Sequence, residues 1–160
     1  EWQRQDYESL PDCRRYFRVL KLTERADALA ELGQRFIPML LAQQRASEAL
    51  EAWVSCVKRK PDFKPDSAQL SYELAQQAWK AGKPRYVLIL AKDFEKRFAG
   101  SPLIPFMLEL VVRAYKQGME QPMQGVAVYM RMKQLFPEHA STREVEWVLR
   151  DELEQLEAKT

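Results

Sequence analysis

The chain has 160 residues, of which 46% are hydrophobic and 30% are charged. This composition is typical of a globular domain with a buried core and not of a disordered chain. Its 25 Lys and Arg residues nearly balance its 23 Asp and Glu residues, and the net charge of +2 is too small to indicate nucleic-acid or anionic-membrane binding by itself. The longest apolar run, 103–108, is far shorter than a membrane span.

The rare residue types exclude several kinds of site. Two cysteines, Cys13 and Cys56, do not make a disulfide framework, and we expect Cys56 to fill a core position. Because His139 is the single histidine, a Cys/His zinc site would lack ligands. We therefore expect no metal and no cofactor.

The start of the chain has neither an initiator Met nor the pattern of a secretory leader. It begins with Glu1 and Trp2, and no basic-then-apolar segment follows them. We therefore expect a piece of a longer polypeptide, with a leaning toward the cytoplasm. A membrane would be reached only through a segment outside this sequence.

The first third of the sequence is predicted to be helical after a tail over 1–10. A short helix is predicted over about 12–22. Thr23 is placed to cap the next helix, over about 26–43. Pro38 inside that helix should kink or split it, because proline lacks the backbone N–H and crowds the preceding turn.

The following helix carries a clear apolar stripe. Its apolar residues recur three and four positions apart, which places them on one helix face. They are Ala46, Ala49, Leu50, Trp53, Cys56 and Val57. The basic residues 58–60 suit the last turn, and Pro61 ends the helix. Asp66 or Ser67 is placed to cap the next helix, which Gly82 ends.

Further helices are predicted in the second half of the chain. They span about 84–98, 103–117, 122–136 and 141–157. Gly118 and Pro137 end the second and third of these, and Ser141 with Glu144 forms a capping box that starts the last. The apolar stripe of that last helix consists of Val145, Val148, Leu149, Leu153 and Leu156. Trp147 is predicted to lie nearly opposite this stripe.

Segments of the chain repeat each other. Residues 74–82 read LAQQAWKAG, and residues 110–118 read LVVRAYKQG, 36 positions later. A second pattern occurs twice with identical spacing, and a third copy lies 38 residues from each. The three copies are Ala49, Trp53 and Pro61; Gly125, Tyr129 and Pro137; and Val87, Ala91 and Ala99. Self-similarity at such a period is typical of stacked helical repeats.

These positions resemble the tetratricopeptide repeat over roughly residues 26–137. That family has a leucine and a small residue in its first helix, a glycine or polar turn, then an alanine, an aromatic residue and a closing proline. The resemblance implies an all-α, right-handed α-solenoid of about three stacked hairpins. It also implies a tail and short cap helix over 1–22, hairpins over 23–140 and a capping helix over 141–160.

The chain departs from this family in three ways. Its period is 36–38 residues instead of about 34. Ala91 stands where an aromatic residue is expected, and Phe36 with Ile37 replaces the leucine and small residue of the first unit. The departures indicate longer helices or turns than the regular repeat has.

In stacked hairpins of this kind, the first helix of each unit lines a concave groove. Counting back from the turn glycines gives the expected groove residues. They are Tyr72, Gln76, Trp79 and Lys80 in one unit, and Leu108, Val112, Tyr115 and Lys116 in the next. An aromatic residue followed by a lysine would thus project from consecutive units. The alternative, weighed evenly, is that Trp79 and Tyr115 pack against the neighbouring unit.

The sequence favours a non-enzymatic scaffold that binds a protein or peptide in this groove. Chaperone-binding members of the family grip a terminal carboxylate with Asn and basic residues, but this chain has no Asn, which disfavours a carboxylate clamp. The rival function is RNA binding by a helical repeat, with rings such as Phe94 and Phe98 among basic residues. We interpret both rings as core, because they lie four positions apart on an apolar stripe.

No pattern of catalytic residues is recognised, and an enzyme is the third alternative. The sequence lacks a glycine-rich phosphate loop, a nucleophile elbow and a metalloprotease motif. His139 lies in a predicted surface turn without a nameable partner. Trp147, on the polar side of the last helix, is predicted to make an outer contact, such as a homodimer interface or a contact with another domain.

Overall fold

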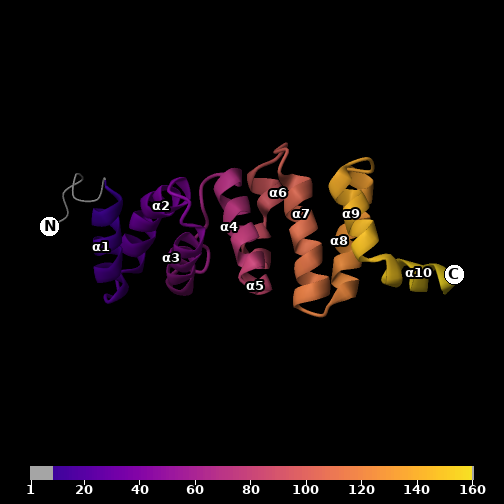
Figure 1. The fold of residues 1–160 in the computed structure, drawn as a ribbon, viewed down its shortest axis with the longest axis horizontal. Coiled ribbons are helices and arrows are strands. Elements are labelled where there is room, and N and C mark those ends of the chain that lie inside the picture. Colours follow the sequence, from indigo (N-terminus) through magenta and orange to yellow (C-terminus); the bar gives the residue numbers. More distant parts are fainter. Residues whose placement is uncertain (1–8, 160) are drawn as a thin grey trace. The chain divides into compact units, whose positions relative to one another are not determined.

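The computed structural model describes residues 9–159, and within this range the chain is helical without strands (Figure 1). The first helices are α1 (Leu10–Lys21), α2 (Ala26–Ala42), α3 (Ala46–Arg59), α4 (Ala68–Lys80), α5 (Pro84–Ala91) and α6 (Phe94–Arg97). They are followed by α7 (Ile104–Arg113), the π-helix η2 (Ala114–Gly118), α8 (Pro122–Leu135), α9 (Ala140–Val148) and α10 (Arg150–Ala158). The all-α prediction is therefore confirmed. The predicted tail lies mostly outside the described residues.

The chain divides into two compact units, and the division falls after Leu70, in the first turn of α4. The helix α1 and the first predicted hairpin, α2 with α3, belong to the first unit, and the helices from α5 onward belong to the second. Among residues 9–159, no helix is both long and apolar enough to cross a membrane.

In the first unit, α2 packs against both α1 and α3. The core contains the predicted stripe of α3, in which Trp53 is fully buried and Cys56 is 1% exposed. Across from it, the rings of Phe17 and Phe36 lie 5.0 Å apart. The prediction that Cys56 fills a core position is confirmed.

A glycine lets α2 approach α3 closely. A Cβ atom on Gly33 would lie 2.7 Å from Cys56 Sγ, which is closer than such atoms pack, and 3.4 Å from the Phe63 ring. A side chain at position 33 would therefore force Cys56 or the helix backbone to shift, so packing favours glycine there.

Proline does not split α2. The helix continues from Ala26 to Ala42 through Pro38, although proline removes one backbone donor there. Ile37 and Leu40, on either side, are buried in the core, and their packing stabilises the helix across the lost bond. Of the two expected effects, a kink or a split, the split does not occur.

The start of α2 also differs from the prediction. Thr23 does not cap the helix; its hydroxyl donates to the Leu20 carbonyl at 2.8 Å and accepts from the Arg25 N–H at 3.3 Å. Thr23 therefore closes the end of α1, and Arg25 precedes α2 without a side-chain cap.

Side chains of α3 hold α1 at both ends. The Arg14 guanidinium donates to both carboxylate oxygens of Glu48, at 2.6 and 2.9 Å. At the other end, Arg59 donates to the carbonyls of Leu20 at 3.0 Å and Thr23 at 2.5 Å, and also to that of Lys21. Capping of the last carbonyls by an arginine satisfies groups that a helix end leaves unpaired.

Glu48→Gln should destabilise the first unit at neutral pH and make it less sensitive to acid. The hydrogen bonds from Arg14 lower the pKa of Glu48 below its ordinary value of 4.5. Because the folded pKa is depressed, this contribution is present above about pH 4.5 and is lost as the pH falls through the folded value. For a pair that is 23% and 31% exposed, we expect about 1 kcal/mol at pH 7.

Urea unfolding at pH 7 and pH 3 measures this difference. The wild-type protein and Glu48→Gln should differ at pH 7, and the difference should shrink as the pH falls toward 3. The matched control is Glu51→Gln, an exposed carboxylate on the same helix, which should leave the midpoint unchanged at both pH values. Equal acid sensitivity in Glu48→Gln and the wild-type protein would contradict the assignment.

In the second unit, α7 packs against α5, α8 and α9. A buried cluster joins α7, α8 and α9 at the C-terminal end. It consists of Val112, Val126, Tyr129, Met132, Val145 and Leu149. Leu153 and Leu156 pack against the cluster. The predicted stripe of the last helix therefore does cover the apolar side of α7 and α8.

Two predicted helices are broken. Asp93 adopts a left-handed conformation with φ of 62°, so the helix expected over 84–98 is divided into α5 and α6. The last helix is divided at Leu149, which separates α9 from α10. The α7 helix also ends earlier than expected, because the Met119 N–H donates to the Ala114 carbonyl, five residues back, and winds η2 as a π-helix.

The start of α9 uses a different cap from the predicted capping box. The Nδ1 atom of His139 accepts a hydrogen bond from the Ser141 N–H at 3.0 Å, so His139 is the N-cap. Ser141 itself lies inside the helix and is 2% exposed. Other predicted ends are confirmed: the Ser67 hydroxyl accepts from the Leu70 N–H at the start of α4, and Gly82 has φ of 72°.

Candidate partner-binding face

Aromatic side chains from three helices of the second unit form a continuous row. The ring of Tyr72, on α4, lies 6.3 Å from that of Phe106, on α7. The Phe106 ring stands edge-on to that of His139, 5.0 Å away. Phe106 is 40% exposed, whereas Tyr72 and His139 are half-buried. Rings held in place by their neighbours at a surface offer contact area at little entropic cost.

Local structure fixes two of these rings. Phe106 lies in the first turn of α7, directly after Pro105, and proline is pre-organised for that position. His139 is held as the N-cap of α9 by its hydrogen bond with Ser141. Both rings therefore stand at helix starts, where the backbone is ordered.

A row of polar side chains lies beside the rings. The Tyr72 hydroxyl is hydrogen-bonded to Gln76, one turn further along α4. Arg113 links α7 to α9, because its guanidinium lies 3.2 Å from Glu109 and 3.3 Å from Glu144. The two rows together are called the α4–α7–α9 face. It consists of Tyr72, Gln76, Phe106, Glu109, Arg113, His139 and Glu144.

The face is slightly acidic. Two carboxylates, Glu109 and Glu144, share the single guanidinium of Arg113, which leaves one negative charge in excess. Burial, and after it the negative charge of Glu109, raises the pKa of Tyr72. The Tyr72 hydroxyl therefore stays protonated and can donate to an acceptor, while the excess carboxylate beside it suits a partner that brings positive charge.

The structure divides the predicted groove residues. Tyr72 and Gln76 lie on the face, but Val112 does not: it is fully buried in the C-terminal cluster. Leu108 packs against the same cluster and lines a pocket on the side of α8. Their neighbours Glu109 and Arg113 occupy the face instead.

The position of the turn after α7 explains this one-residue error. The prediction counted back from Gly118 with the period of an α-helix. The η2 segment uses a five-residue hydrogen bond between Met119 and Ala114, so it has more residues per turn than an α-helix. The left-handed turn residue that corresponds to Gly82 is Glu120, two residues after Gly118. The extra residue of η2 takes back one of these two, so the surface positions of α7 lie one residue later than counted.

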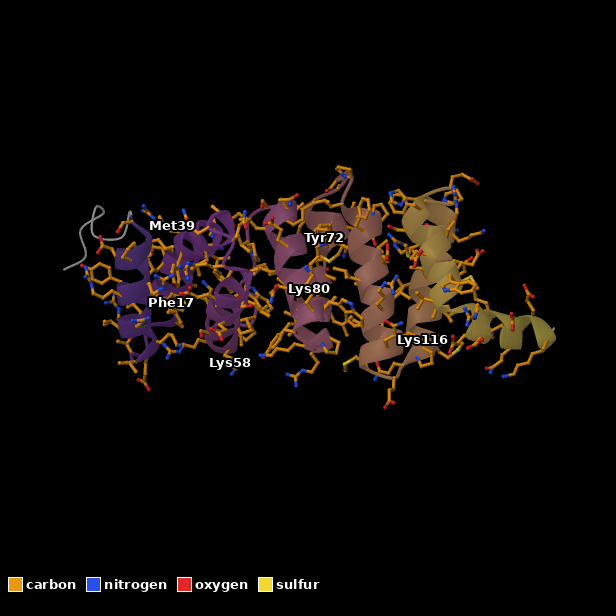
Figure 2. The ribbon with its side chains drawn as sticks, in the orientation of Figure 1. Phe17, Met39, Lys58, Tyr72, Lys80 and Lys116 are labelled. Atoms are coloured by element: carbon orange, nitrogen blue, oxygen red, sulfur yellow. The ribbon has the colours of Figure 1, made fainter. Side chains whose placement is uncertain are left out.

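The predicted aromatic–lysine pairs are partly engaged within the chain. Trp79 is half-buried, and its Cζ3 atom would lie 3.6 Å from a Cβ atom on Gly118, which supports the packing interpretation. Lys116 donates to both carboxylate oxygens of Glu152 at 2.7 Å and lies beside the start of α10 (Figure 2). Lys80 is exposed and Tyr115 is half-buried. These residues do not form a second matching pair of surface anchors.

Several residues of the face were missed by sequence reasoning. Phe106 gave one usable signal, because it is an aromatic residue outside the apolar stripe of its helix. Glu109 and Arg113 gave another, since an acidic and a basic residue four positions apart form a surface pair on a helix. His139 and Glu144 gave none, because their part in the face depends on the packing of α9 against α7.

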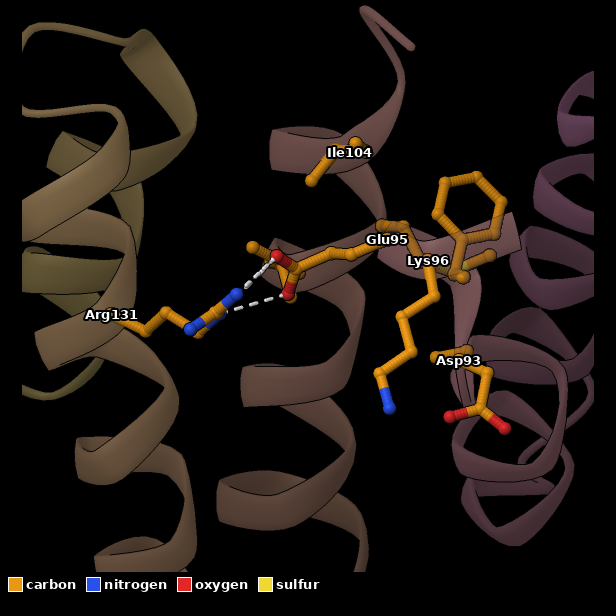
Figure 3. Close-up of a pocket in the computed structure, with 9 residues that line it drawn as sticks. Asp93, Glu95, Lys96, Ile104 and Arg131 are labelled. Atoms are coloured by element: carbon orange, nitrogen blue, oxygen red, sulfur yellow. Dashed lines mark hydrogen bonds and ion pairs between the residues drawn. The ribbon is translucent and has the colours of Figure 1, made fainter. Parts of the chain in front are cut away.

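A separate pocket of about 220 Å³ lies among α5, α6, α7 and α8. Arg131 reaches across from α8 to Glu95 and donates to it at 2.8–3.2 Å, while Asp93 and Lys96 stand on the other side (Figure 3). Ile104 contributes to its apolar wall. Because Arg131 neutralises Glu95, this pocket offers no carboxylate poised as a general base at that position.

The described residues offer no built metal site and no activated thiol. Within 9–159, no three His, Cys, Asp or Glu side chains are grouped so that they could hold a metal ion. Burial raises the pKa of the Cys56 thiol to about 12, so this thiol stays protonated at neutral pH and is a poor nucleophile. The predicted absence of a cofactor remains a prediction.

Comparison with known proteins assigns no family to the chain. It matches no protein-family model, and neither a curated protein nor a solved structure matches it. The functional conclusion therefore rests on the side chains of the α4–α7–α9 face.

Proposed function

We propose that the protein is a non-enzymatic scaffold that binds a segment of a partner protein across the α4–α7–α9 face. The main support for this proposal is the exposure of Phe106. Its large ring is 40% exposed and lies between the rings of Tyr72 and His139. Aromatic anchors beside satisfied polar groups are typical of the centre of protein interfaces. The row spans three helices, which suits an extended or helical peptide better than a small molecule.

The proposal includes a tetratricopeptide-like arrangement of helical hairpins in a right-handed α-solenoid. In the first unit α2 packs against α3, and in the second α7 packs against α8, as the hairpins of such an array would. The amphipathic α1 and α9 would then be its caps. Stacked hairpins bury their apolar sides against each other and leave one row of helices for partners.

The chemistry of the face favours a partner segment with an apolar or aromatic side chain and nearby positive charge. The apolar or aromatic side chain would lie on Phe106. The positive charge would pair with Glu109 or Glu144, which share one arginine. A carboxylate clamp stays disfavoured, since the chain has no Asn.

RNA binding is the weaker alternative. Phe94 is 2% exposed, and Phe98 packs edge-on against it at 5.2 Å, so these two rings are not presented for base stacking. A labelled single-stranded RNA should show no salt-dependent binding between 50 and 200 mM salt, about the range over which phosphate contacts change affinity strongly.

Phe106→Ala should weaken peptide binding at least about tenfold, because truncation of a central aromatic anchor costs about 2 kcal/mol or more. Peptides would be selected from a random display library with the wild-type protein, and their dissociation constants measured by fluorescence anisotropy for both proteins. The matched control is Leu135→Ala, which truncates a side chain that is 47% exposed on α8, outside the face.

The control should leave the dissociation constants unchanged, and thermal melts should show both variants folded. Selected peptides that bind Phe106→Ala as tightly as the wild-type protein would place the binding surface elsewhere. An equal loss in Leu135→Ala would also contradict the proposal.

A further inference from the structure

The last helix presents a side that the second unit does not cover. Within α10 no residue is fully buried, and in Figure 1 the helix leaves the end of α9 sideways. A groove of about 540 Å³ runs between α8 and α10. It is lined by Met130 of α8 and by Arg150, Leu153 and Glu154 of α10, among others.

Apolar surface accompanies this groove. Met130 is 53% exposed, and Trp147 is 65% exposed, as the sequence predicted for the outer side of the last helix. The Arg150 guanidinium lies over the Trp147 ring at 4.1 Å, so the ring is joined to the groove edge by a cation–π contact. Leu153 is half-buried. Exposed large apolar residues at one edge indicate a contact surface.

The charges that line the groove side of α10 are arranged with a polarity, although Asp151 and Glu152 make the first turn as a whole acidic. Arg150 stands at the start of the helix, and Glu154 and Glu157 follow at intervals of three and four residues, which places all three on one side. If two copies of α10 lie antiparallel, the positive end of each meets the negative part of the other. A two-fold axis produces this arrangement, because it pairs the same patch of both subunits in opposite directions.

We propose that the protein forms a homodimer in which two copies of α10 pack antiparallel in the groove beside α8. Arg150 of each copy then pairs with the acidic residues of the other, and Leu153, Met130 and Trp147 are covered. A second copy is favoured over another partner because the charge pattern is self-complementary. The α4–α7–α9 face is made by other residues and takes no part.

Two charge-reversal variants should each weaken the homodimer when tested alone, and their mixture should restore association. Arg150→Glu makes all three charged residues on the groove side of α10 acidic, and Glu154→Arg makes the first two of them basic. Each variant alone should have an association constant about tenfold or more below that of the wild-type protein, since every change is repeated twice across the two-fold axis. Sedimentation velocity of the full chain over a concentration series measures this constant.

Mixing the two variants is the decisive step. The acidic α10 of Arg150→Glu can face the basic α10 of Glu154→Arg, so the mixture should form a heterodimer within about threefold of wild-type affinity, as complementary charges across an interface predict. Restoration on mixing cannot come from changes within one helix. Circular dichroism should show unchanged helicity in Arg150→Glu, because a carboxylate suits the first turn of a helix.

Lys159→Glu is the matched control. It changes the charge by the same amount as Arg150→Glu at an exposed position beyond the end of α10, and the dimer should persist. A wild-type protein that sediments as a monomer at every concentration would overturn the proposal. The proposal also fails if the mixed variants stay monomeric, or if Lys159→Glu weakens association as much as Arg150→Glu.

Discussion

Trp53→Ala is expected to lower the free energy of unfolding of the first unit by about 3–5 kcal/mol, the usual cost of removing a buried indole. Trp53 is fully buried on α3, in the helix that packs against α2. Gly33 already brings these two helices so close that a Cβ atom would not fit. A core held at that spacing cannot collapse fully around the missing ring, so a cavity remains.

Urea unfolding followed by circular dichroism measures this loss, in the transition that includes α1, α2 and α3. Val54→Ala is the control, because Val54 is the adjacent residue on α3 and is only half-buried. It should cost no more than about 1.5 kcal/mol, since it removes two methyl groups from a partly exposed site. A loss below about 1 kcal/mol in Trp53→Ala would contradict its assignment to the core.

Periodicity predicted the stripes well, because burial on one helix face requires only that apolar side chains recur every three or four residues. Trp53 and Cys56 in the first unit and Val145 and Leu149 in the second are buried as their spacing indicates. A helix end marked by glycine was also predicted: Gly82 takes the positive φ expected after a helix. These features depend on local sequence alone.

Helix breaks and helix starts at residues other than glycine and proline could not be predicted from the local sequence. Asp93 takes a left-handed conformation that aspartate tolerates but does not require. The sequence contains a capping box at Ser141, but His139 is the N-cap instead, because α9 begins two residues earlier than the capping box predicts. In each case the choice depends on how neighbouring helices position the backbone.

The candidate face shows the same limit. Its part on α4, Tyr72 and Gln76, follows from the register of that helix alone. The part on α7 depends on where the following turn falls: it lies at Glu120 and not at Gly118, and η2 holds one extra residue, so Arg113 and not Val112 is at the surface. A π-helix has no local sequence signature that would have revealed this shift in phase.

Removal of the last two helices should have the largest effect in the second unit. A chain that ends at His139 loses Val145 and Leu149, which are both fully buried against Val112 and Met132. Each buried aliphatic side chain contributes about 1.5–3 kcal/mol, and its loss also exposes the apolar surface that it covered. The shortened protein should unfold at lower urea concentration and associate non-specifically, as exposed apolar edges do.

Light scattering during size-exclusion chromatography tests this expectation against a matched truncation. A chain that ends at Leu149 keeps the buried contacts of Val145 and Leu149 and lacks only α10, so it should remain folded and monodisperse. If the proposed dimer forms through α10, this longer truncation should be a monomer, whereas the shorter one should scatter as a broad mixture of large species. A stable, monodisperse protein ending at His139 would show that α9 is not a required cap, because the apolar side of α7 and α8 would then be tolerated in water.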